Sequence, residues 1–589
     1  MRFNKLASVP YQPPQFPAGP WAKVSDIPTG ACVIEGGALK KAGRKSCTFI
    51  DQDAIPHYYC DSVSGSDSND GLSEGTAKAT VSAVTALASG PCVFEFKRGS
   101  YFREQLTVPE GDYVVKAYGH GDRPIFDCAD VVSTFTKTGG FTNVYQVTYN
   151  NELTDAGKTK ISMWFDETRM IRVTSQSLCD STPASFYAIV SGTGTDTVYF
   201  HNPDSTDPNG DGRVYEVAVR NYGVVCTNRD TNTAEIYSVR TQRNGNNDGS
   251  LIGAKYISDC YAYDGTVHNM WNGGIAEDCI AERAECFSSG GTTYFVSYRD
   301  TNDNTSYRYT RCQAIGLGTA SFGWKELNCP GFFAHTASGA DPLEHILFED
   351  CKATGCGAFG LGNVKNAAFY NSEAISCREG FDVAKVSSAF VGSKVHYKTS
   401  GGSVLKSTNR CIQGSASQNV FINGCSFCVS EVSGAMLYGK LGDNVVINSS
   451  DFRQALTVST AGIYDNLASL ATVNFQKCIF SGVDTNRNKF IFSASNLTVI
   501  SDSNLWEDEL CADGTLNGVP YSNLTAWQAL SSQDGNSITG DPLFTGDTAT
   551  GDFSIDAGSP ANSIGAGSTN YVVTAQDLRY MNVLNPVYQ

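Results

Sequence analysis

The chain has 589 residues, 41% of them hydrophobic and 17% charged, and its formal net charge at pH 7 is −17. This length exceeds what one compact core usually serves, so we expect several domains or an elongated repeat architecture. The acidic balance, and the absence of any basic tract interleaved with aromatic residues, argue against a nucleic-acid partner.

Residues 1–56 are rich in proline and are expected to be extended. They carry a few positive charges but no apolar run behind them, so we expect no export by an ordinary signal peptide. Nowhere do about 18 apolar residues stand together, so we also expect no membrane insertion.

Residues 57–128 contain short apolar segments between glycine-rich turns, as in CVFEFKRGSYFREQLTV. The 58 glycines of the chain, against 19 prolines, suit many short strands joined by tight turns. One loop carries Asp67, Asn69 and Asp70, which could hold an ion. We interpret it instead as a tight turn closed by hydrogen bonds.

Residues 129–220 interrupt this pattern with longer alternating segments such as KTKISMWFDETRMIRV, which predict antiparallel strands. Asp207, Asn209 and Asp211 match the start of a calcium loop. Ala218, however, stands where the closing bidentate glutamate is required. We therefore interpret this segment as a turn and expect no metal site.

From about residue 234 one short phrase recurs: alternating apolar positions, two polar residues, a small residue, and another apolar residue, as in YISDCYA and ILFEDCKA. The small residue recurs at intervals of 21 to 39 residues, at Cys260, Ala284, Cys312, Cys351, Ser372, Ser393, Cys425, Ser450, Cys478 and Ser503. Without a helical pattern between repeats, each repeat is expected to be one coil of a β-solenoid whose small residues stack in the core. An antiparallel sandwich is the weaker alternative, because sandwiches do not repeat one phrase at this interval.

The 20 cysteines are spread through the chain and often stand inside these apolar patterns. We expect them to be buried free thiols that act as small hydrophobic residues.

Two segments resemble a known superfamily. YYCDSVSGSDSNDGLSEGTAKATVSAV resembles the opening of pectate-lyase-like β-helix proteins, and GDPLFTGDTATGDFSIDAGSPANSIGAG resembles their closing segment. The resemblance implies an all-β, right-handed parallel β-helix. Its parts would be a capping helix and first coils (57–128), a β-rich insertion (129–220), the main helix (221–540) and a closing segment (541–589). Such motifs are specific for fold and weak for reaction.

The short leading segment, residues 1–56, on such a β-helix resembles the virion-attachment end of a bacteriophage tailspike depolymerase. This resemblance implies a homotrimeric virion protein, made in the host cytoplasm, that binds a bacterial capsule, exopolysaccharide or O-antigen. The leading segment would contact a phage tail or baseplate protein. A secreted bacterial lyase or epimerase is the alternative.

The first candidate site follows the repeat marker Cys260. Asp264, His268 and Trp271 offer an acid, an imidazole and an aromatic platform for the apolar face of a sugar. A polar turn with an exposed histidine is the alternative explanation.

Two long intervals between markers predict loops after Ala284 and Cys312. The loops carry the candidates Tyr298, Arg299, Trp324, Lys325, Glu326 and His335. Loops that leave on one edge of the solenoid would wall a groove lined by acids, imidazoles and cations. Ordinary loops with solvated charges are the alternative.

Arg378 and Asp382 stand in a later coil, where Asp382 could complete a carboxylate pair with Asp264 or Glu326. We predict catalysis by these three acids, assisted by His268 or His335. The predicted substrate contacts are Trp271, Tyr298, Arg299, Trp324, Lys325 and Arg378.

Glycoside hydrolysis is favoured over β-elimination, because the candidates hold several acids, whereas a uronate lyase needs a clear cluster of cations or a calcium site. The cations Arg299, Lys325 and Arg378 keep the lyase open. A non-catalytic glycan-binding spike would carry the same aromatic residues. No dinucleotide, Walker, HExxH or GxSxG motif occurs in a suitable context, so we expect no cofactor.

Overall fold

The structure is a computed structural model. It describes the backbone of residues 33–35 and 38–40 and then residues 50–571 with gaps. The gaps are 152–160, 190–193, 229–230, 246–248, 254, 266–267, 272–273, 284–292, 300–305, 317–329, 337–342, 358, 363, 378, 384–386, 397–398, 401–402, 405–409, 416–418, 430–435, 441–443, 455–463, 467–470, 483–489, 493–496 and 509–513.

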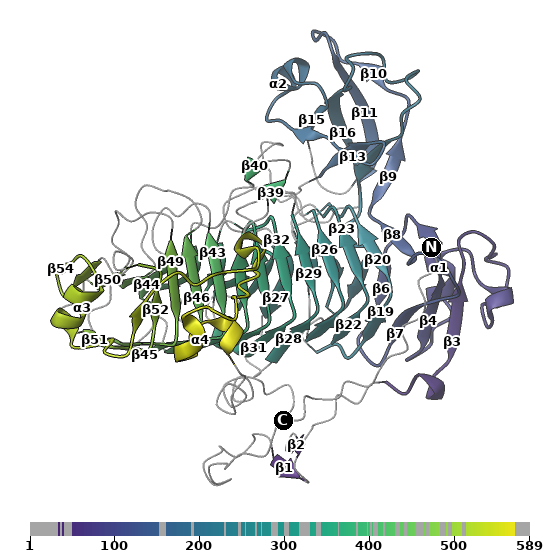
Figure 1. The fold of residues 1–589 in the computed structure, drawn as a ribbon. Helices are drawn as coiled ribbons and strands as arrows, with labels where there is room; N and C mark the ends of the chain where they lie inside the picture. Colours follow the sequence, from purple (N-terminus) through teal and green to yellow (C-terminus); the bar gives the residue numbers. More distant parts are fainter. Residues whose placement is uncertain are drawn as a thin grey trace.

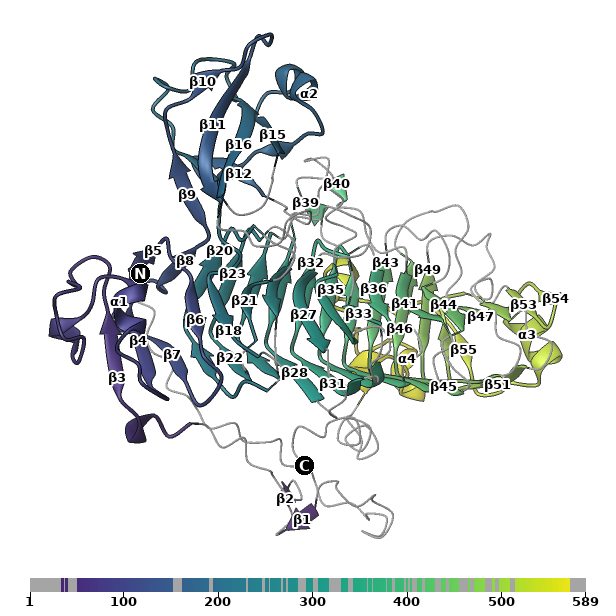
Figure 2. The ribbon, with the colours of Figure 1, turned by 180° about the vertical axis from the view of Figure 1, so that it is seen from behind.

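Three long sheets run side by side along the molecule, each with 14 strands (Figures 1 and 2). From β4 to β53 each coil contributes one strand to each sheet in the order I, II, III, and neighbouring coils pair in parallel. Among the described residues of these sheets, one antiparallel pair joins β53 to β54, at the C-terminal end of sheet III. The predicted right-handed parallel β-helix is thus confirmed.

Sheet I contains β3 (His57–Cys60), β4 (Val93–Lys97), β7 (Val114–Tyr118), β19 (Glu235–Tyr237), β22 (Tyr256–Ser258), β25 (Ile275–Glu277), β28 (Ser306–Thr310), β31 (Leu343–Glu349), β34 (Val364–Tyr370), β37 (Ser387–Val391), β42 (Asn419–Asn423), β45 (Asn444–Asn448), β48 (Ala471–Gln476) and β51 (Leu497–Asp502). Sheet II contains β5 (Tyr101–Phe102), β8 (Ile125–Asp127), β20 (Arg240–Gln242), β23 (Tyr261–Tyr263), β26 (Ile280–Glu282), β29 (Gln313–Ile315), β32 (Lys352–Thr354), β35 (Glu373–Ile375), β38 (Lys394–His396), β43 (Ser426–Val429), β46 (Asp451–Gln454), β49 (Ile479–Gly482), β52 (Leu505–Trp506) and β55 (Ile538–Thr539). Sheet III contains β6 (Leu106–Val108), β18 (Val224–Cys226), β21 (Gly249–Ile252), β24 (His268–Trp271), β27 (Thr293–Arg299), β30 (Phe332–Thr336), β33 (Phe359–Leu361), β36 (Glu379–Asp382), β41 (Arg410–Ser415), β44 (Leu437–Lys440), β47 (Tyr464–Asn466), β50 (Phe490–Phe492), β53 (Gly514–Leu516) and β54 (Val519–Tyr521).

The corner between sheets I and II explains the recurring phrase. From β19 to β52 each such connection has two residues, of which the first adopts a positive φ, as in Asp259 and Asp350. Glycine, asparagine and aspartate tolerate this left-handed conformation best and recur there, although serine, Arg311 and Lys477 also adopt it. The second residue points into the core, and this is the repeat marker.

The marker column is buried and in register: Cys260, Cys312 and Cys351 are at most 1% exposed. Two of the ten predicted members are wrong. Cys279, not Ala284, follows the left-handed Asp278, and Asn504 follows Ser503, which itself adopts the positive φ. Every cysteine in the described ranges is buried and free of a disulfide, as expected.

Aromatic side chains stack between coils inside the solenoid. In sheet III the rings of Phe295, Phe332 and Phe359 are stacked with centroids 4.8 and 4.7 Å apart. This spacing matches the separation of neighbouring strands, so one ring per coil fills the interior without a gap.

The β-rich insertion leaves sheet II after β8 and returns to sheet III at β18, and it stands above the first coils in Figure 1. One sheet holds β10 (Thr136–Lys137), β11 (Val144–Asn151), β16 (Gly194–His201), β15 (Ser185–Ile189) and β14 (Ile171–Arg172). The other holds β13 (Thr168–Arg169), β12 (Met163–Phe165), β17 (Tyr215–Ala218) and β9 (Ala129–Val132). Helix α2 (Gln176–Ser181) packs on the first, and the insertion has its own apolar core.

Short elements complete the chain. They are β1 (Val33–Glu35), β2 (Ala38–Lys40), α1 (Val81–Thr85), β39 (Thr399–Ser400), β40 (Ser403–Val404), α3 (Leu524–Ser531) and α4 (Ala561–Ile564). The segment 541–571 folds back along the outer face of sheet II, where Phe553 packs on Cys428 and Ser568 bonds to Asp451. In the described part of the chain, no helix has the length and hydropathy needed to cross a membrane.

Candidate functional site

The long connections of the main β-helix leave at the two edges of sheet III. The corner between sheets I and II has two residues throughout, whereas β29 and β30 are joined by residues 316–331 and β30 and β31 by residues 337–342. Loops raised on a rigid scaffold are where binding and catalytic residues usually lie. The face between these connections, the outer face of sheet III, is therefore the candidate site.

This arrangement corrects the expected loops. Tyr298 and Arg299 end β27, and His335 lies in β30, so these residues belong to strands rather than loops. FVSYR and FFAHT are rich in aromatic and β-branched residues, which favour strands. The connections after Ala284 and after Cys312, which end at residues 292 and 331, both join sheet II to sheet III and so share one edge, as expected. Residues 300–305 and 337–342 join sheet III to sheet I at the other edge.

One row of residues runs along the outer face. The strand register places these positions side by side in successive coils: Val225, Ile252, Trp271, Val296, Phe333, Gly360, Asp382, Gln413, Tyr438 and Asp465. The preceding residue of each strand, such as Phe332 and Phe381, faces the core. The row begins with apolar and aromatic positions and continues with acids and amides.

Phe333 and Asp382 stand two rungs apart in this row, with Gly360 between them. A Cβ on Gly360 would lie 2.9 Å from Cδ2 of Phe333, so the Phe333 ring leans over Gly360. Phe333 and Asp382 are both partly exposed. The apolar face of a sugar stacks on such a ring, and a carboxylate can protonate a glycosidic oxygen.

The other predicted residues in the described ranges stand in several coils of sheet III. His268 begins β24 and Trp271 ends it, and Tyr298 and His335 are neighbours in the register of β27 and β30. Trp324, Lys325, Glu326 and Arg378 lie outside the described residues.

The register decides which carboxylates can pair. Asp264 precedes β24, which is four rungs from β36, or about 19 Å at about 4.8 Å per rung. Paired catalytic carboxyls lie roughly 5–9.5 Å apart, so Asp264 and Asp382 do not form the expected pair. Glu326 lies outside the described residues, so the register does not test its pairing with Asp382 either way.

Asp264 is buried under the insertion. Asp264 directly follows β23 with a φ of 58°, and it is 0% exposed. Its carboxylate accepts a hydrogen bond from Nε1 of Trp164 and forms an ion pair with Arg169, whose Nη2 lies 2.9 Å from Oδ1. Nε of Arg283, on the next coil, lies 3.8 Å from the same oxygen. These partners indicate that Asp264 holds the insertion on the solenoid. They do not favour the expected role of Asp264 as an acid in contact with substrate.

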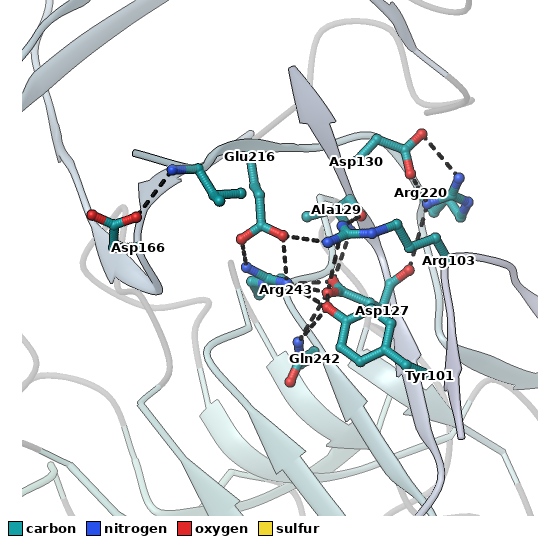
Figure 3. A network of polar contacts seen from close by, with 11 residues as sticks. Tyr101, Arg103, Asp127, Ala129, Asp130, Asp166, Glu216, Arg220, Gln242 and Arg243 are labelled. Atoms are coloured by element: carbon teal, nitrogen blue, oxygen red, sulfur yellow. Dashed lines mark hydrogen bonds and ion pairs between the residues drawn. The ribbon is translucent and has the colours of Figure 1, made fainter. Parts of the chain in front are cut away.

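A second buried charge cluster lies one coil earlier (Figure 3). The guanidinium of Arg243 binds both Asp127, at the end of β8, and Glu216, in β17 of the insertion. Nη2 of Arg103 donates a hydrogen bond of 2.5 Å to Glu216, and the hydroxyl of Tyr101 donates to Asp127.

The cluster shifts the pKa values of its members. Burial alone would lower the pKa of Arg243, but the two carboxylates raise it. Burial and Asp127 raise the pKa of Tyr101.

The two clusters share one corner of the solenoid. Arg243, Asp264 and Arg283 occupy the same left-handed position, with φ of 61°, 58° and 55°, on three successive coils between sheets II and III. Their charges alternate along the corner. Trp164 of the insertion contacts this column, because the guanidinium carbon of Arg243 lies 5.5 Å from the centre of its ring.

The two acidic loops considered for ion binding form hydrogen-bonded turns. Oδ1 of Asp67 accepts from the backbone N–H of Ala79 and Thr80, at 2.9 and 3.0 Å. Oδ1 of Asp207 accepts from the N–H of Asn209 at 3.0 Å. Both carboxylates thus close their own loops, as interpreted from the sequence.

Comparison with known proteins supports the fold. No protein-family model matches the sequence, and no curated protein matches it significantly. The solved structure of XylC with xylose aligns with 83% of this chain and 88% of its own at 11% identity, with a TM-score of 0.51.

Two further matches have lower TM-scores. A structure described as a glycoside hydrolase covers 85% of this chain and 99% of its own at 8% identity, with a TM-score of 0.35. A tailspike of Acinetobacter baumannii bacteriophage AP22, in complex with A. baumannii capsular saccharide, covers 70% and 72% at 12% identity, with a TM-score of 0.22. The likeness to XylC shows that this chain shares its fold, which in this chain is a parallel β-helix.

Proposed function

We propose that this protein binds a polysaccharide along the outer face of sheet III and cleaves it by glycoside hydrolysis. One observation carries the proposal: a row in register joins the aromatic Phe333 to Asp382, on the face between the long connections. Along this row Phe333 and Asp382 are partly exposed, whereas Ile252 and Val296 are buried, so we place the glycan on the part of the row that begins at Phe333.

Asp382 and Glu326 are the proposed acid pair. In inverting hydrolysis one carboxyl protonates the leaving oxygen and the other activates water, and in retaining hydrolysis the second carboxyl is the nucleophile. His335, in β30, would assist proton transfer. Trp271, Tyr298 and Trp324 would stack on sugar rings, and Arg299, Lys325 and Arg378 would bind hydroxyl or carboxylate groups.

The biological role that we propose is that of a phage tailspike. The extended leading segment, residues 1–56, would attach to a tail or baseplate protein, and the β-helix would act on a bacterial capsule, exopolysaccharide or O-antigen. Three chains would associate through their long solenoid faces. Light scattering of the purified protein tests the last point: three chain masses are expected, and one chain mass at micromolar concentration would reject the trimer.

A product assay on a panel of purified bacterial polysaccharides tests the reaction. Hydrolysis releases new reducing ends without unsaturation. β-Elimination would instead give an unsaturated, ultraviolet-absorbing uronate at the new chain end and would replace hydrolysis in the proposal. Binding without any release of reducing ends would show a receptor-binding spike and reject catalysis.

A further inference from the structure

We propose that Cys356 and Cys377 are a redox-active pair that closes into a disulfide bridge fitting between two neighbouring coils of the folded solenoid. The oxidant is a small disulfide of the glutathione type. The inference assigns a covalent modification site to the interior of the β-helix. It does not depend on the proposed activity on polysaccharides.

The two thiols occupy equivalent positions in successive coils. Cys356 lies two residues after the end of β32, and Cys377 lies two residues after the end of β35, the strand with which β32 pairs in parallel. Their sulfur atoms lie 3.9 Å apart, and both residues are 0% exposed. Neighbouring strands are about 4.8 Å apart, within the range of roughly 4.4–6.8 Å between Cα atoms that disulfides span. The main chain is therefore already placed for a bridge.

The pair stands apart from the other cysteines of the solenoid. Two residues after β29 and two residues after β38, the strands on either side of this pair of coils, the sequence has Leu317 and Lys398. The marker column, in contrast, stacks several cysteines in successive coils. A bridge at the position of Cys356 therefore has one expected partner, which is Cys377.

The packing around Cys356 favours a bridge over other products of thiol exchange. A Cβ on Gly331 would lie 2.9 Å from Sγ of Cys356 and 3.0 Å from the Cβ atoms of Ala314 and Ala353. The interior is filled on this side, so a glutathione molecule attached to Cys356 does not fit in the closed coil. The direct bridge adds no atoms and draws two neighbouring sulfur atoms together.

The step is a thiol–disulfide exchange. During folding, before the coils close, the thiolate of Cys356 attacks a sulfur atom of oxidised glutathione, which gives a mixed disulfide and releases one reduced glutathione. The thiolate of Cys377 then attacks Sγ of Cys356 and releases the second. In total, two protein thiols are oxidised to one disulfide, and one glutathione disulfide is reduced to two thiols. Burial alone would raise the pKa of Cys377, but its hydrogen bonds with Cys356 and the backbone hold this pKa below its usual value, which favours the attacking thiolate.

The bridge would fasten two coils of the candidate face. Cys356 stands three residues before β33, and Cys377 stands two residues before β36. These two strands pair in register, with Gly360 opposite Asp382. A disulfide at the start of both strands would thus add a covalent link beside the coil that carries Asp382.

Peptide mapping of the full-length chain tests the inference in two arms. In the first, the reduced parent is unfolded in urea and refolded in mixtures of reduced and oxidised glutathione, so that the oxidant reaches the thiols before they are buried. In the second, the folded parent is treated with diamide, a small azo compound that takes up the two hydrogen atoms. Free thiols are then alkylated, and the peptides are identified by mass spectrometry.

Cys377→Ala is the test variant, and Cys351→Ser is its matched control. Cys351 is a buried cysteine on the coil of Cys356, and serine at its place repeats Ser372 of the next coil. We expect a 356–377 bridge in the parent and in Cys351→Ser, whereas Cys356 should be recovered alkylated in Cys377→Ala. The bridged parent should have a Tm a few degrees above that of the reduced parent, and oxidation should not change the Tm of Cys377→Ala.

Alkylation of both cysteines of the parent in both arms would overturn the inference, and so would a bridge from Cys356 to a different cysteine. A bridged parent with a Tm at or below that of the reduced parent would overturn it too, because the bridge would then distort the coils instead of fitting between them.

Discussion

The indole N–H of Trp164, in the insertion, donates a hydrogen bond to the carboxylate of Asp264, which lies 100 residues later at a corner of the solenoid. Both residues are 0% exposed. The bond therefore joins two parts of the chain that have separate cores, and it does so in a place that water does not reach.

Trp164→Phe should lower the free energy of unfolding by about 1–3 kcal/mol, because it leaves a buried carboxylate with one donor fewer. Urea denaturation measures the change. Tyr149→Phe is the control within the insertion, since it removes a buried hydroxyl for which no hydrogen-bond partner is found among the described residues. An equal loss of stability in both variants would show that the hydrogen bond of Trp164 makes no specific contribution to the free energy of unfolding.

The marker column predicts which substitutions the solenoid tolerates. Cys351 stacks in register with Ser372, so Cys351→Ser should cost no more than about 1 kcal/mol, with the new hydroxyl bonded as Ser372 bonds to the oxygen of Tyr370. Cys351→Leu should cost about 1–3 kcal/mol, because the interior is filled and the larger side chain displaces its neighbours. Thermal unfolding of both variants is the measurement, and the reverse order would contradict the stacking.

Much of the fold was predictable because, from β19 to β52, the corner between sheets I and II always has two residues. The marker therefore keeps a constant place in the recurring phrase. The markers Ala284 and Ser503 were misassigned because they were chosen by residue size. The register is set by the positive φ of Asp278 and Ser503, and residue size does not show backbone conformation. The partners of Asp264 could not be predicted, since no local pattern tells how an insertion docks on coils that follow it 100 residues later.

Asp451 should make stability depend on pH. Burial raises the pKa of its carboxyl from 3.8 to about 7, although Ser568 donates to it. The folded state thus binds the proton more tightly than the unfolded state, and this contribution is complete below pH 3.8 and is lost as pH rises to about 7. At 1.36 kcal/mol per pKa unit the loss is about 4 kcal/mol.

Asp451→Asn should remove this part of the pH dependence. Urea denaturation from pH 4 to pH 8 should show the stability of the parent falling relative to the variant as pH rises. Asp556→Asn changes an exposed carboxylate on the same returning segment and should follow the parent. Parallel curves for the parent and Asp451→Asn would mean that Asp451 is ionised in the folded protein.

Phe333→Ala should weaken saccharide binding without stopping the reaction. Loss of one stacking contact of about 0.5–1.5 kcal/mol raises KM about two- to tenfold, while kcat is retained because the acids stay in place. Phe333→Tyr keeps the ring and should behave as the parent. Steady-state kinetics on the polysaccharide that the parent cleaves is the measurement. An unchanged KM in Phe333→Ala would show that the Phe333 ring does not contact the substrate.

The release of reducing ends by Asp382→Asn is the most direct test of the proposal that sheet III carries the active face. The account predicts a loss of 10²-fold or more in kcat, with the fold intact by circular dichroism, as expected for the removal of an acid–base group. Asp278→Asn, a carboxylate at the corner between sheets I and II, is the control and should retain full activity. Normal cleavage by Asp382→Asn, on a polysaccharide that the parent cleaves, would contradict the account and move the active site away from the outer face of sheet III.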